Sequence, residues 1–389
     1  MKNVLLTLYR NRSHSLYKQF INNPPEGYRY FVLDDFLDDF IFESSPNFFI
    51  EITRKIKRNR VIIKAAVKNN IDIIYCCDGM LLFNSPIPWI VDLEHVTGLI
   101  SNNYRLWKIG KLIIPYLLKQ KNLKYLIPWT EAGANALRCN FKLSREVLNK
   151  IVPVRLCLEK IADYEDIERK KTPHDSFTIV FVTSVNYNGE NEFYAKGGRI
   201  VVRVFEELKK KMDVTLLLRG KIPAEFGYLR NDPTAEIHEN PLSSDEFQNL
   251  FLRSDVFFFP GYQSPGMAFL DAMNYNLPIV STNVFSNAEM VKDGWNGFLT
   301  DFPAANIAFY LSSEFDIKGV PSGVRAREDQ IDAGMIEDLV GKIVRLQKKS
   351  SLLKSMGANA KKMVQNEFSL MKRNNQLKSI YNEITCNKI

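Results

Sequence analysis

The segment Phe257–Thr282 combines a Gly/Pro loop with polar side chains that could bind hydroxyl groups and an anion. It reads as a strand, a loop, a helix that begins near Gly266, and a second strand. Gln263 lies in the loop and Asp271 lies eight residues later, on the helix. The carboxylate of Asp271 could accept hydrogen bonds from two vicinal hydroxyl groups, while Gln263 could meet a second polar group. The alternative is a helix that only packs, with Asp271 paired to a nearby base.

Two predicted helix N-termini could bind an anion. Gly266 has no side chain, so its backbone can approach a ligand, and the N–H groups of Met267 and Ala268 would point at an anion there. Lys196 precedes a Gly-Gly pair, beginning with Gly197, at the start of another predicted helix. A lysine beside a helix N-terminus can hold a diphosphate through its charge and the backbone N–H groups. On spacing alone, a glycine turn with a solvated Lys196 is favoured.

The first half of the chain offers one further candidate. Glu94 and His95 follow the apolar run "PWIVDL", so they lie at the carboxyl end of a predicted strand. A lone histidine is more often structural than catalytic, and both interpretations stay open. The chain has no G-x-G, no Walker A lysine loop and no Asp-x-Asp. These absences argue against the dinucleotide fingerprint, the P-loop and one common way of holding a metal-bound sugar diphosphate.

Length and composition indicate a globular protein of two domains. The chain has 389 residues, 46% of them hydrophobic and 25% charged, which argues against disordered and fibrous classes. Its net charge of +8 favours anionic partners. Nucleic acid is not expected among them, because no recognised nucleic-acid motif is present. Five cysteines without a C-x-x-C pair argue against a disulfide framework or zinc site and favour a reducing compartment.

Short apolar runs alternate with helical stretches in two series. The runs lie at residues 2–9, 28–35, 71–77, 88–94 and 124–130, and then at 177–185, 214–220, 255–261 and 277–282. Such runs are typical of parallel sheets that helices cover on both faces. We predict an α/β fold with an N-terminal domain over residues 1–165 and a C-terminal domain over 175–369. A C-terminal helix over 370–389 can pack back on the first domain.

Smaller features complete this organisation. The charged stretch Leu158–Ser176 is the expected linker, and Ser243 with Glu246 predicts a capping box at a helix start. The apolar N-terminus is expected to be a strand rather than a signal peptide. Ligands of open parallel sheets bind beyond the carboxyl ends of the strands. Two such sheets facing each other would form a cleft, and Phe257–Thr282 should line it.

The motifs of the second half, taken in order, resemble the retaining glycosyltransferases of the GT-B fold, specifically the large GT4-type family (glycosyl transferases group 1). The resemblance covers roughly Phe177–Thr300, through "KGG", "LLLRG", "SSDEFQNLFLRSDVFFFP", "QSPGMAFLDAM", "NLPIVST" and "NAEMVKDGWNGFL". The run "SLLKSMGANAKKMVQNEFSLMKRNNQLKSIYNEI" is similar to that family's C-terminal helices. In the first half, "VDLEHV" and "PWTEAGANAL" match less closely. The resemblance implies two Rossmann-like, doubly wound domains facing across a cleft.

The resemblance also implies a donor and a set of site residues. The donor would be a UDP- or GDP-linked sugar, held mainly by the second domain without a metal or other cofactor. Lys196 would hold the diphosphate, Asp271 the ribose hydroxyls, and Gln263 the donor sugar, which His95 would contact near the reacting carbon. The implied catalytic residues are His95 and Lys196, and the implied substrate-binding residues are Ser184, Gly197, Gln263, Ser264, Gly266, Met267, Ala268 and Asp271.

Three departures from the family pattern stand out. Gln263 and Asp271 form Gln-x7-Asp where the family has Glu-x7-Glu; Ser184 stands near the place of the family's arginine; and "YRNRSHSLY" replaces the first Gly-Gly loop. Gln263 removes a charge and adds two donors, from which we hypothesise a donor sugar that is anionic or carries a carbonyl acceptor. Arg10 or Arg12 could supply phosphate charge in the first loop.

The function expected from the resemblance is transfer of a sugar, with retention, to a glycan or lipid-linked acceptor. The alternative is a catalytically silent GT-B scaffold, or a sugar-nucleotide-binding partner of an active transferase. Residues 102–129 contain six basic residues, no acidic ones, and aromatic residues that include Trp107, Tyr116 and Tyr125. This pattern predicts either peripheral contact with a membrane or a helix packed on the first sheet. The expected location is cytoplasmic, with the inner face of the cell membrane as the alternative.

Overall fold

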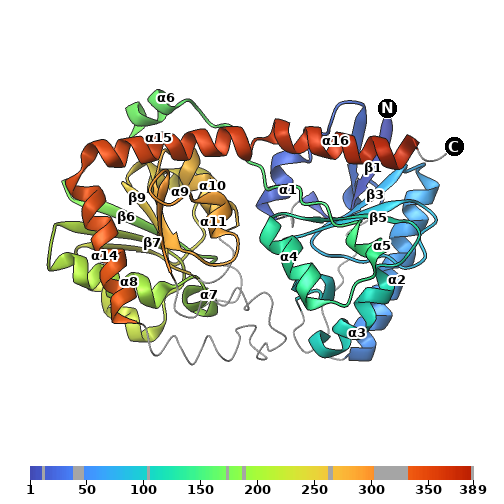
Figure 1. The fold of residues 1–389 in the computed structure, drawn as a ribbon, viewed down its shortest axis with the longest axis horizontal. Helices are drawn as coiled ribbons and strands as arrows, with labels where there is room; N and C mark the ends of the chain where they lie inside the picture. Colours follow the sequence, from blue (N-terminus) through green and yellow to red (C-terminus); the bar gives the residue numbers. More distant parts are fainter. Residues whose placement is uncertain are drawn as a thin grey trace. The chain divides into compact units, whose positions relative to one another are not determined.

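The computed structural model describes residues 1–10, 14–37, 48–102, 106–171, 175–185, 190–261, 266–301 and 332–386. These residues form two compact units (Figure 1). The first unit contains residues 1–157 and the C-terminal helix α16 (Leu370–Cys386). The second unit contains residues 158–301 and 332–369 of the described chain. Gln263 and Ser264 lie outside the described residues.

The first unit has a five-stranded parallel sheet in the order β2-β1-β3-β4-β5. The strands are β1 (Lys2–Leu6), β2 (Tyr28–Val32), β3 (Ile73–Cys76), β4 (Trp89–Leu93) and β5 (Leu123–Pro128). Every residue of β3 and β4 is buried, as expected for strands covered on both faces. The chain adds β2 on one side of β1 and β3 on the other, so the strand order reverses between β1 and β3.

Helices cover both faces of this sheet. They are α1 (Ser15–Phe20), α2 (Phe48–Lys68), α3 (Trp107–Leu117), α4 (Glu131–Asn140), α5 (Arg145–Leu148) and α16, with short 3-10 helices η2 (Leu33–Asp35) and η3 (Val96–Ile100). Thr130 caps α4 by accepting a hydrogen bond from the N–H of Gly133 at 3.0 Å. Helix α16 packs on β2, where the hydroxyl groups of Tyr30 and Tyr381 are 3.0 Å apart.

The second unit has a six-stranded parallel sheet in the order β11-β10-β9-β6-β7-β8. The strands are β6 (Phe177–Val182), β7 (Val214–Arg219), β8 (Ala235–His238), β9 (Val256–Phe259), β10 (Ile279–Thr282) and β11 (Gly297–Thr300). The strand order reverses between β6 and β9. All four predicted strands are present, and the two edge strands, β8 and β11, escaped prediction. Each has only four residues, and β8 is half-exposed along its whole length.

The helices of the second unit follow the expected pattern. They are α6 (Tyr164–Lys170), α7 (Glu190–Ala195), α8 (Gly198–Lys209), α9 (Ser244–Leu252), α10 (Met267–Asn274), α11 (Asn287–Met290), α14 (Ala333–Lys348) and α15 (Ser350–Glu367), with the 3-10 helix η5 (Ala224–Asn231). The capping box of α9 is confirmed. The Ser243 hydroxyl accepts from the Glu246 N–H at 3.3 Å, and the Glu246 carboxylate accepts from the Ser243 N–H at 2.8 Å.

The charged stretch expected as a linker is an ordered part of the second unit up to Lys171. It carries α6, whose Ile167 is buried, and the side chain of Asn276 donates to the backbone oxygen of Tyr164 at 2.9 Å. The chain enters the second unit at Leu158 and leaves it at Ser369, and these two residues form a parallel β-bridge. The charged side chains of α6 therefore form the outer face of a helix rather than an extended linker.

Two further expectations concern membranes and thiols. Among the described helices, none is long and apolar enough to cross a membrane. All five cysteines are free thiols; Cys76, Cys77 and Cys157 are buried, while Cys139 and Cys386 are exposed. Helix α3 buries Trp107 and Ile114 but exposes other apolar side chains, so one of its faces packs within the first unit. Peripheral contact of residues 102–129 with a membrane stays a prediction.

Candidate functional site

The described residues of the predicted donor site lie at one edge of the second sheet. Because parallel strands end on the same side, their carboxyl ends share an edge, here called the carboxyl edge. Ser184 follows β6 at this edge, Lys196 and Gly197 connect α7 to α8 after β6, and Gly266 begins α10 after β9. Strands β6 and β9 flank the point where the strand order reverses, which is where ligands bind in open α/β sheets.

Backbone contacts between glycines join two of these loops. Gly197 has φ +86°, and a Cβ atom there would lie 2.6 Å from the carbonyl carbon of Pro260. A Cβ atom at Gly261 would lie 2.7 Å from the carbonyl carbon of Lys196. Both positions therefore need glycine for the loops to touch. The contact places Lys196 beside Gly261, which precedes Gln263 by two residues in the sequence.

The side chain of Lys196 is held in place rather than fully solvated. Its ammonium group forms an ion pair with Glu192 on α7 at 3.9 Å and lies 5.8 Å from the centroid of the Phe259 ring. Only 18% of the Lys196 side chain is exposed. The solvated interpretation therefore does not describe this structure. A paired lysine above the end of β9 can still exchange Glu192 for a phosphate oxygen.

Helix α10 begins with a backbone conformation that favours glycine. Gly266 has φ 53° and ψ −134° and precedes Met267, the first residue of the helix. Among the described residues, no side chain caps this end of α10. The first backbone N–H groups of the helix, among them those of Met267 and Ala268, lie at the carboxyl edge. Such an end is suited to an anion.

Asp271 lies on the second turn of α10 and has an unusual affinity for its proton. The residue is half-buried, but protein atoms surround its carboxyl group, and the loss of hydration raises its pKa to about 7. Tyr275 lies one helical turn further, and burial followed by the charge of Asp271 raises the pKa of its hydroxyl to about 12. No basic partner of Asp271 occurs among the described residues, so the structure gives no support to the paired interpretation.

A basic residue at this edge was not predicted. Arg219 ends β7, the neighbour of β6, and its guanidinium donates a hydrogen bond to the backbone oxygen of Thr183 at 2.6 Å. Loss of hydration lowers the pKa of Arg219. Ser184 stands near the position at which the family has an arginine. In this chain the guanidinium of Arg219 lies at the end of the neighbouring strand. The strand-final Arg before Gly220 in "LLLRG" is the signal that could have indicated it.

In the first unit, His95 follows β4 and begins η3. Its Nδ1 atom contacts the hydroxyl of Thr97, which in turn donates to Asn102 at 2.9 Å. Burial lowers the pKa of His95, while the charge of Glu94 opposes that effect. The imidazole is therefore neutral at pH 7, and it can donate or accept a hydrogen bond without carrying charge.

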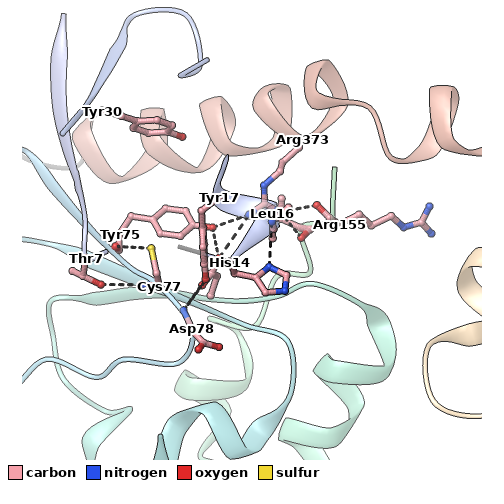
Figure 2. Close-up of polar contacts among 12 residues, drawn as sticks. Thr7, His14, Leu16, Tyr17, Tyr30, Tyr75, Cys77, Asp78, Arg155 and Arg373 are labelled. Atoms are coloured by element: carbon pink, nitrogen blue, oxygen red, sulfur yellow. Dashed lines mark hydrogen bonds and ion pairs between the residues drawn. The ribbon is translucent and has the colours of Figure 1, made fainter. Parts of the chain in front are cut away.

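Asp78 lies at the carboxyl end of β3, the neighbour of strand β4, which His95 follows. Asp78 was not predicted as a site residue. Its backbone has φ +53°, and its N–H donates to Asp92 at 2.9 Å and to the Tyr17 hydroxyl at 2.8 Å (Figure 2). The residue as a whole is exposed. Loss of hydration at its carboxyl group, followed by the charges of Asp92 and Glu94, raises its pKa to about 6.

A buried polar network around Asp92 holds the loop that contains Asp78. Asp92 on β4 is fully buried and accepts hydrogen bonds from the hydroxyls of Tyr17 and Tyr75 at 2.7 and 2.8 Å. Arg373 of α16 donates to the Tyr75 hydroxyl at 2.8 Å and lies 3.9 Å from Asp92. Figure 2 shows Arg373 reaching from α16 toward this network. The C-terminal helix thereby supplies the countercharge of a buried carboxylate.

Within the described ranges, no group of three or more His, Cys, Asp or Glu side chains is arranged to hold a metal ion. Among the described residues, positive charge is brought to the carboxyl edge of the second unit by Lys196, Arg219 and the N-terminus of α10.

Comparison with known proteins gives a family match and a fold. Residues 176–309 match the family model described as Glycosyl transferases group 1. No curated protein matches the sequence. Sucrose-phosphate synthase (tll1590) from Thermosynechococcus elongatus is similar with a TM-score of 0.66 and 13% identity, over 100% of both chains.

Two other solved structures cover the chain to a similar extent. A glycosyltransferase from Rickettsia africae ESF-5 has a TM-score of 0.61 and 15% identity, over 100% of this chain and 99% of that one. HepE from Anabaena, solved with UDP-glucose, has a TM-score of 0.63 and 12% identity, over 98% and 100%. The chain therefore has the α/β GT-B fold, and its residues 176–309 match the group 1 glycosyl transferases.

Proposed function

We propose that this chain is a retaining, GT4-type glycosyltransferase that moves a hexosyl group from a nucleotide sugar to a glycan or lipid-linked acceptor. The observation that carries the proposal is the joint placement of Lys196, the N-terminus of α10 and Asp271 at the carboxyl edge, where β6 and β9 flank the reversal of strand order. The match of residues 176–309 to the group 1 family and the HepE structure with UDP-glucose support a nucleotide-sugar donor.

In the proposed reaction an acceptor hydroxyl replaces the nucleoside diphosphate at the anomeric carbon, on the same face of the sugar. Negative charge grows on the diphosphate as its bond breaks, and preorganised donors there lower the barrier. Lys196 and the first N–H groups of α10 supply these donors, while Asp271 binds the ribose hydroxyls. Neutral His95 contacts the donor sugar near the reacting carbon. The hydroxyl proton leaves with the diphosphate, and no covalent nucleophile is assigned.

The binding test is a thermal shift of the purified chain against UDP, GDP, ADP, CMP and their common sugars. One nucleotide should raise the melting temperature, by about 5 to 10 °C at a hundredfold excess over its Kd. The rise should disappear in Asp271→Ala and persist in Asp245→Ala, which removes an exposed carboxylate of α9 in the same unit. A chain that binds no nucleotide would instead be the silent scaffold.

The chemical test follows release of the nucleoside diphosphate and the configuration of the product. We expect Lys196→Ala to lower kcat by about a hundredfold or more, in the range found for other transition-state donors. Because the chain supplies the charge, chelation with EDTA should leave the rate unchanged. NMR of the product should show the anomeric configuration of the donor. Binding without turnover for any acceptor would favour the sugar-nucleotide-binding partner.

A further inference from the structure

The side chain of Arg219 crosses from β7 to the carboxyl end of β6. In the parallel register Arg219 lies opposite Val182, the last residue of β6. The N–H of Thr183 donates to the backbone oxygen of Arg219 at 2.7 Å, and the Nη1 atom of Arg219 donates to the backbone oxygen of Thr183 at 2.6 Å. These two hydrogen bonds hold the guanidinium group at the carboxyl edge, beside the residue that precedes Ser184.

The chain around Arg219 is closely packed, so this position is fixed. A Cβ atom at Gly220 would collide with the Oγ1 atom of Thr183, and the loops that follow β6 and β7 are therefore in contact. The guanidinium carbon of Arg219 also lies 5.7 Å from the centroid of the Phe247 ring on α9. A side chain that is already positioned loses little freedom when it binds a ligand.

The described residues give this guanidinium group no carboxylate. Several other arginines of the second unit form ion pairs with glutamates, namely Arg199–Glu225, Arg230–Glu239 and Arg253–Glu236. Within the described ranges, the partners of Arg219 are a backbone carbonyl group and an aromatic ring. Hydrogen bonds to Glu236 raise the pKa of Arg253, whereas loss of hydration lowers the pKa of Arg219. The charge of Arg219 is therefore desolvated without an anion to balance it.

Much of the hydrogen-bonding capacity of Arg219 is also unused. A guanidinium group presents a planar fork of N–H donors, and in the described part of the chain only Nη1 has an acceptor. The Nε atom is buried and has no hydrogen-bond partner among the described residues. A charged group that has lost water without gaining acceptors is unfavourable. Because the residue is half-buried rather than enclosed, an anion can reach it and remove that penalty.

Arg219 and Lys196 approach the end of β6 from its two sides. Strand β6 lies between β9 and β7 in the sheet. Lys196 lies on the β9 side, where Gly197 contacts Pro260, and Arg219 reaches the end of β6 from the β7 side. An anion bound at the end of β6, next to the reversal of strand order, would lie between these two cations. A diphosphate, which carries charge on two linked groups, matches cations on two sides better than a single carboxylate does.

We propose that Arg219 binds the diphosphate of the sugar donor at the end of β6, from the side opposite Lys196. The fork of the guanidinium group can donate two parallel hydrogen bonds to phosphate oxygens, which the ammonium group of a lysine cannot do. The identity of the ligand as a donor rests on the proposed glycosyl transfer, whereas the binding of a diphosphate does not. The competing outcome is an arginine that only ties β7 to β6.

Isothermal titration calorimetry on the full chain tests the assignment with ligands that differ only in the diphosphate. UDP, GDP and ADP are each compared with their nucleosides, and inorganic pyrophosphate is measured alone. We expect Arg219→Gln to weaken the binding of nucleoside diphosphate and of pyrophosphate by about tenfold or more, as for lost hydrogen bonds to a charged group. Nucleoside binding should change less than about twofold. Equal weakening of nucleoside and nucleoside diphosphate would identify a structural arginine and overturn the proposal.

Matched variants separate the position of the charge from its presence. Arg203→Gln removes an exposed arginine of α8 in the same unit and should change diphosphate binding less than about twofold. Arg219→Lys keeps the charge but lacks the fork, so we expect an intermediate loss of about three- to fivefold. This variant carries the comparison if Arg219→Gln does not fold. A loss in Arg203→Gln as large as that in Arg219→Gln would show a general effect of charge and overturn the proposal.

The same titrations separate this assignment from the proposed function. A chain that binds a nucleoside diphosphate equally well with and without Arg219 overturns only the assignment of Arg219. A chain that binds pyrophosphate through Arg219 but binds no nucleotide keeps the diphosphate site and overturns the proposed glycosyl transfer. A chain that binds neither ligand overturns both.

Discussion

Asp271 and Asp78 each hold a proton more tightly than an aspartate in water, and each lies at the carboxyl edge of its own sheet. Loss of hydration raises the pKa of Asp271 to about 7 and that of Asp78, with help from neighbouring charges, to about 6. Ionisation of a carboxyl group costs free energy when the group has lost hydration and has no countercharge. A ligand whose hydroxyl groups donate to the ionised form would recover part of that cost.

Nucleotide affinity should therefore depend on the ionisation of Asp271. Ribose hydroxyls donate to the carboxylate, so the affinity is full above pH 7 and falls by up to tenfold for each pH unit below it. Calorimetric titration of the nucleotide identified by thermal shift, between pH 5 and 8.5, measures this dependence. Asp271→Asn binds more weakly at pH 8 and lacks the step near pH 7. A step that persists in the variant would come from another group.

The same pKa makes a prediction for stability. Because the pKa of Asp271 in the folded chain is raised from 3.8 to about 7, its contribution to stability is complete below 3.8 and is lost as the pH rises to about 7. Asp271→Asn should match the parent at pH 4 and exceed it above pH 7, by up to about 4 kcal/mol. Chemical denaturation at both pH values measures the difference. A variant that is equally less stable at both would contradict it.

Gly197 is a second position where one residue controls the site. In Gly197→Ala the new Cβ would collide with the Pro260 carbonyl, and the left-handed backbone would add about 1–2 kcal/mol of strain. We expect a loss of about 2–4 kcal/mol in unfolding free energy, and weaker nucleotide binding as Lys196 shifts. Gly341→Ala is the control, because that helical glycine has no neighbour within 4 Å. It should gain about 0.5–1 kcal/mol.

For single residues, the sequence indicated those that a short local motif marks. Lys196, Gly197 and Gly266 carry local signals, namely glycines at helix starts, and the structure places them at one edge. Asp78 carries no such signal. Its raised pKa comes first from loss of hydration and then from the charge of Asp92, which lies fourteen residues later on another strand. This environment exists only in the packed sheet.

Helix α16 is the element on which the first unit most clearly depends. Arg373 is 1% exposed and contributes the countercharge of Asp92 from a helix far along the chain. Arg373→Met should lower the unfolding free energy by about 3–5 kcal/mol, because it leaves a buried carboxylate unpaired. Urea denaturation followed by circular dichroism measures the loss.

A double-mutant cycle isolates the electrostatic part of this effect. Adding Asp92→Asn to Arg373→Met removes the unpaired charge, so the double variant should be more stable than the sum of the two single losses predicts. Arg345→Met is the matched control, since Arg345 is a helical arginine of the second unit that stacks on the Phe298 ring. It should cost about 1 kcal/mol or less. Strict additivity at Arg373 and Asp92 would contradict the pairing.

Helices and strands could be predicted where the residues of the segment itself indicate that it is buried. The predicted strands are apolar runs, and β3, β4 and β9 are buried throughout. Strand β8 escaped because "AEIH" at a sheet edge has a partner on one side only and stays half-exposed. Helix α3 was ambiguous for a different reason, since both of its faces are apolar and only one of them packs.

At the scale of the whole molecule, the two units have separate hydrophobic cores and separate sheets. Differential scanning calorimetry should therefore resolve two unfolding transitions. The nucleotide found by thermal shift should raise only the transition of the second unit, and Arg373→Met should lower only that of the first. A single transition that both changes move together would show that the units unfold as one. The predicted cleft between two facing sheets remains a prediction.

The position of α16 has a consequence for synthesis on the ribosome. The second unit is complete once residue 369 has emerged, whereas the first unit, which is translated earlier, still lacks the helix that carries Arg373. Domains usually become folded in the order of their synthesis, and this chain would reverse that order. A premature stop near residue 370 would leave a finished second unit attached to an N-terminal half with an exposed apolar face, which chaperones and proteases would recognise.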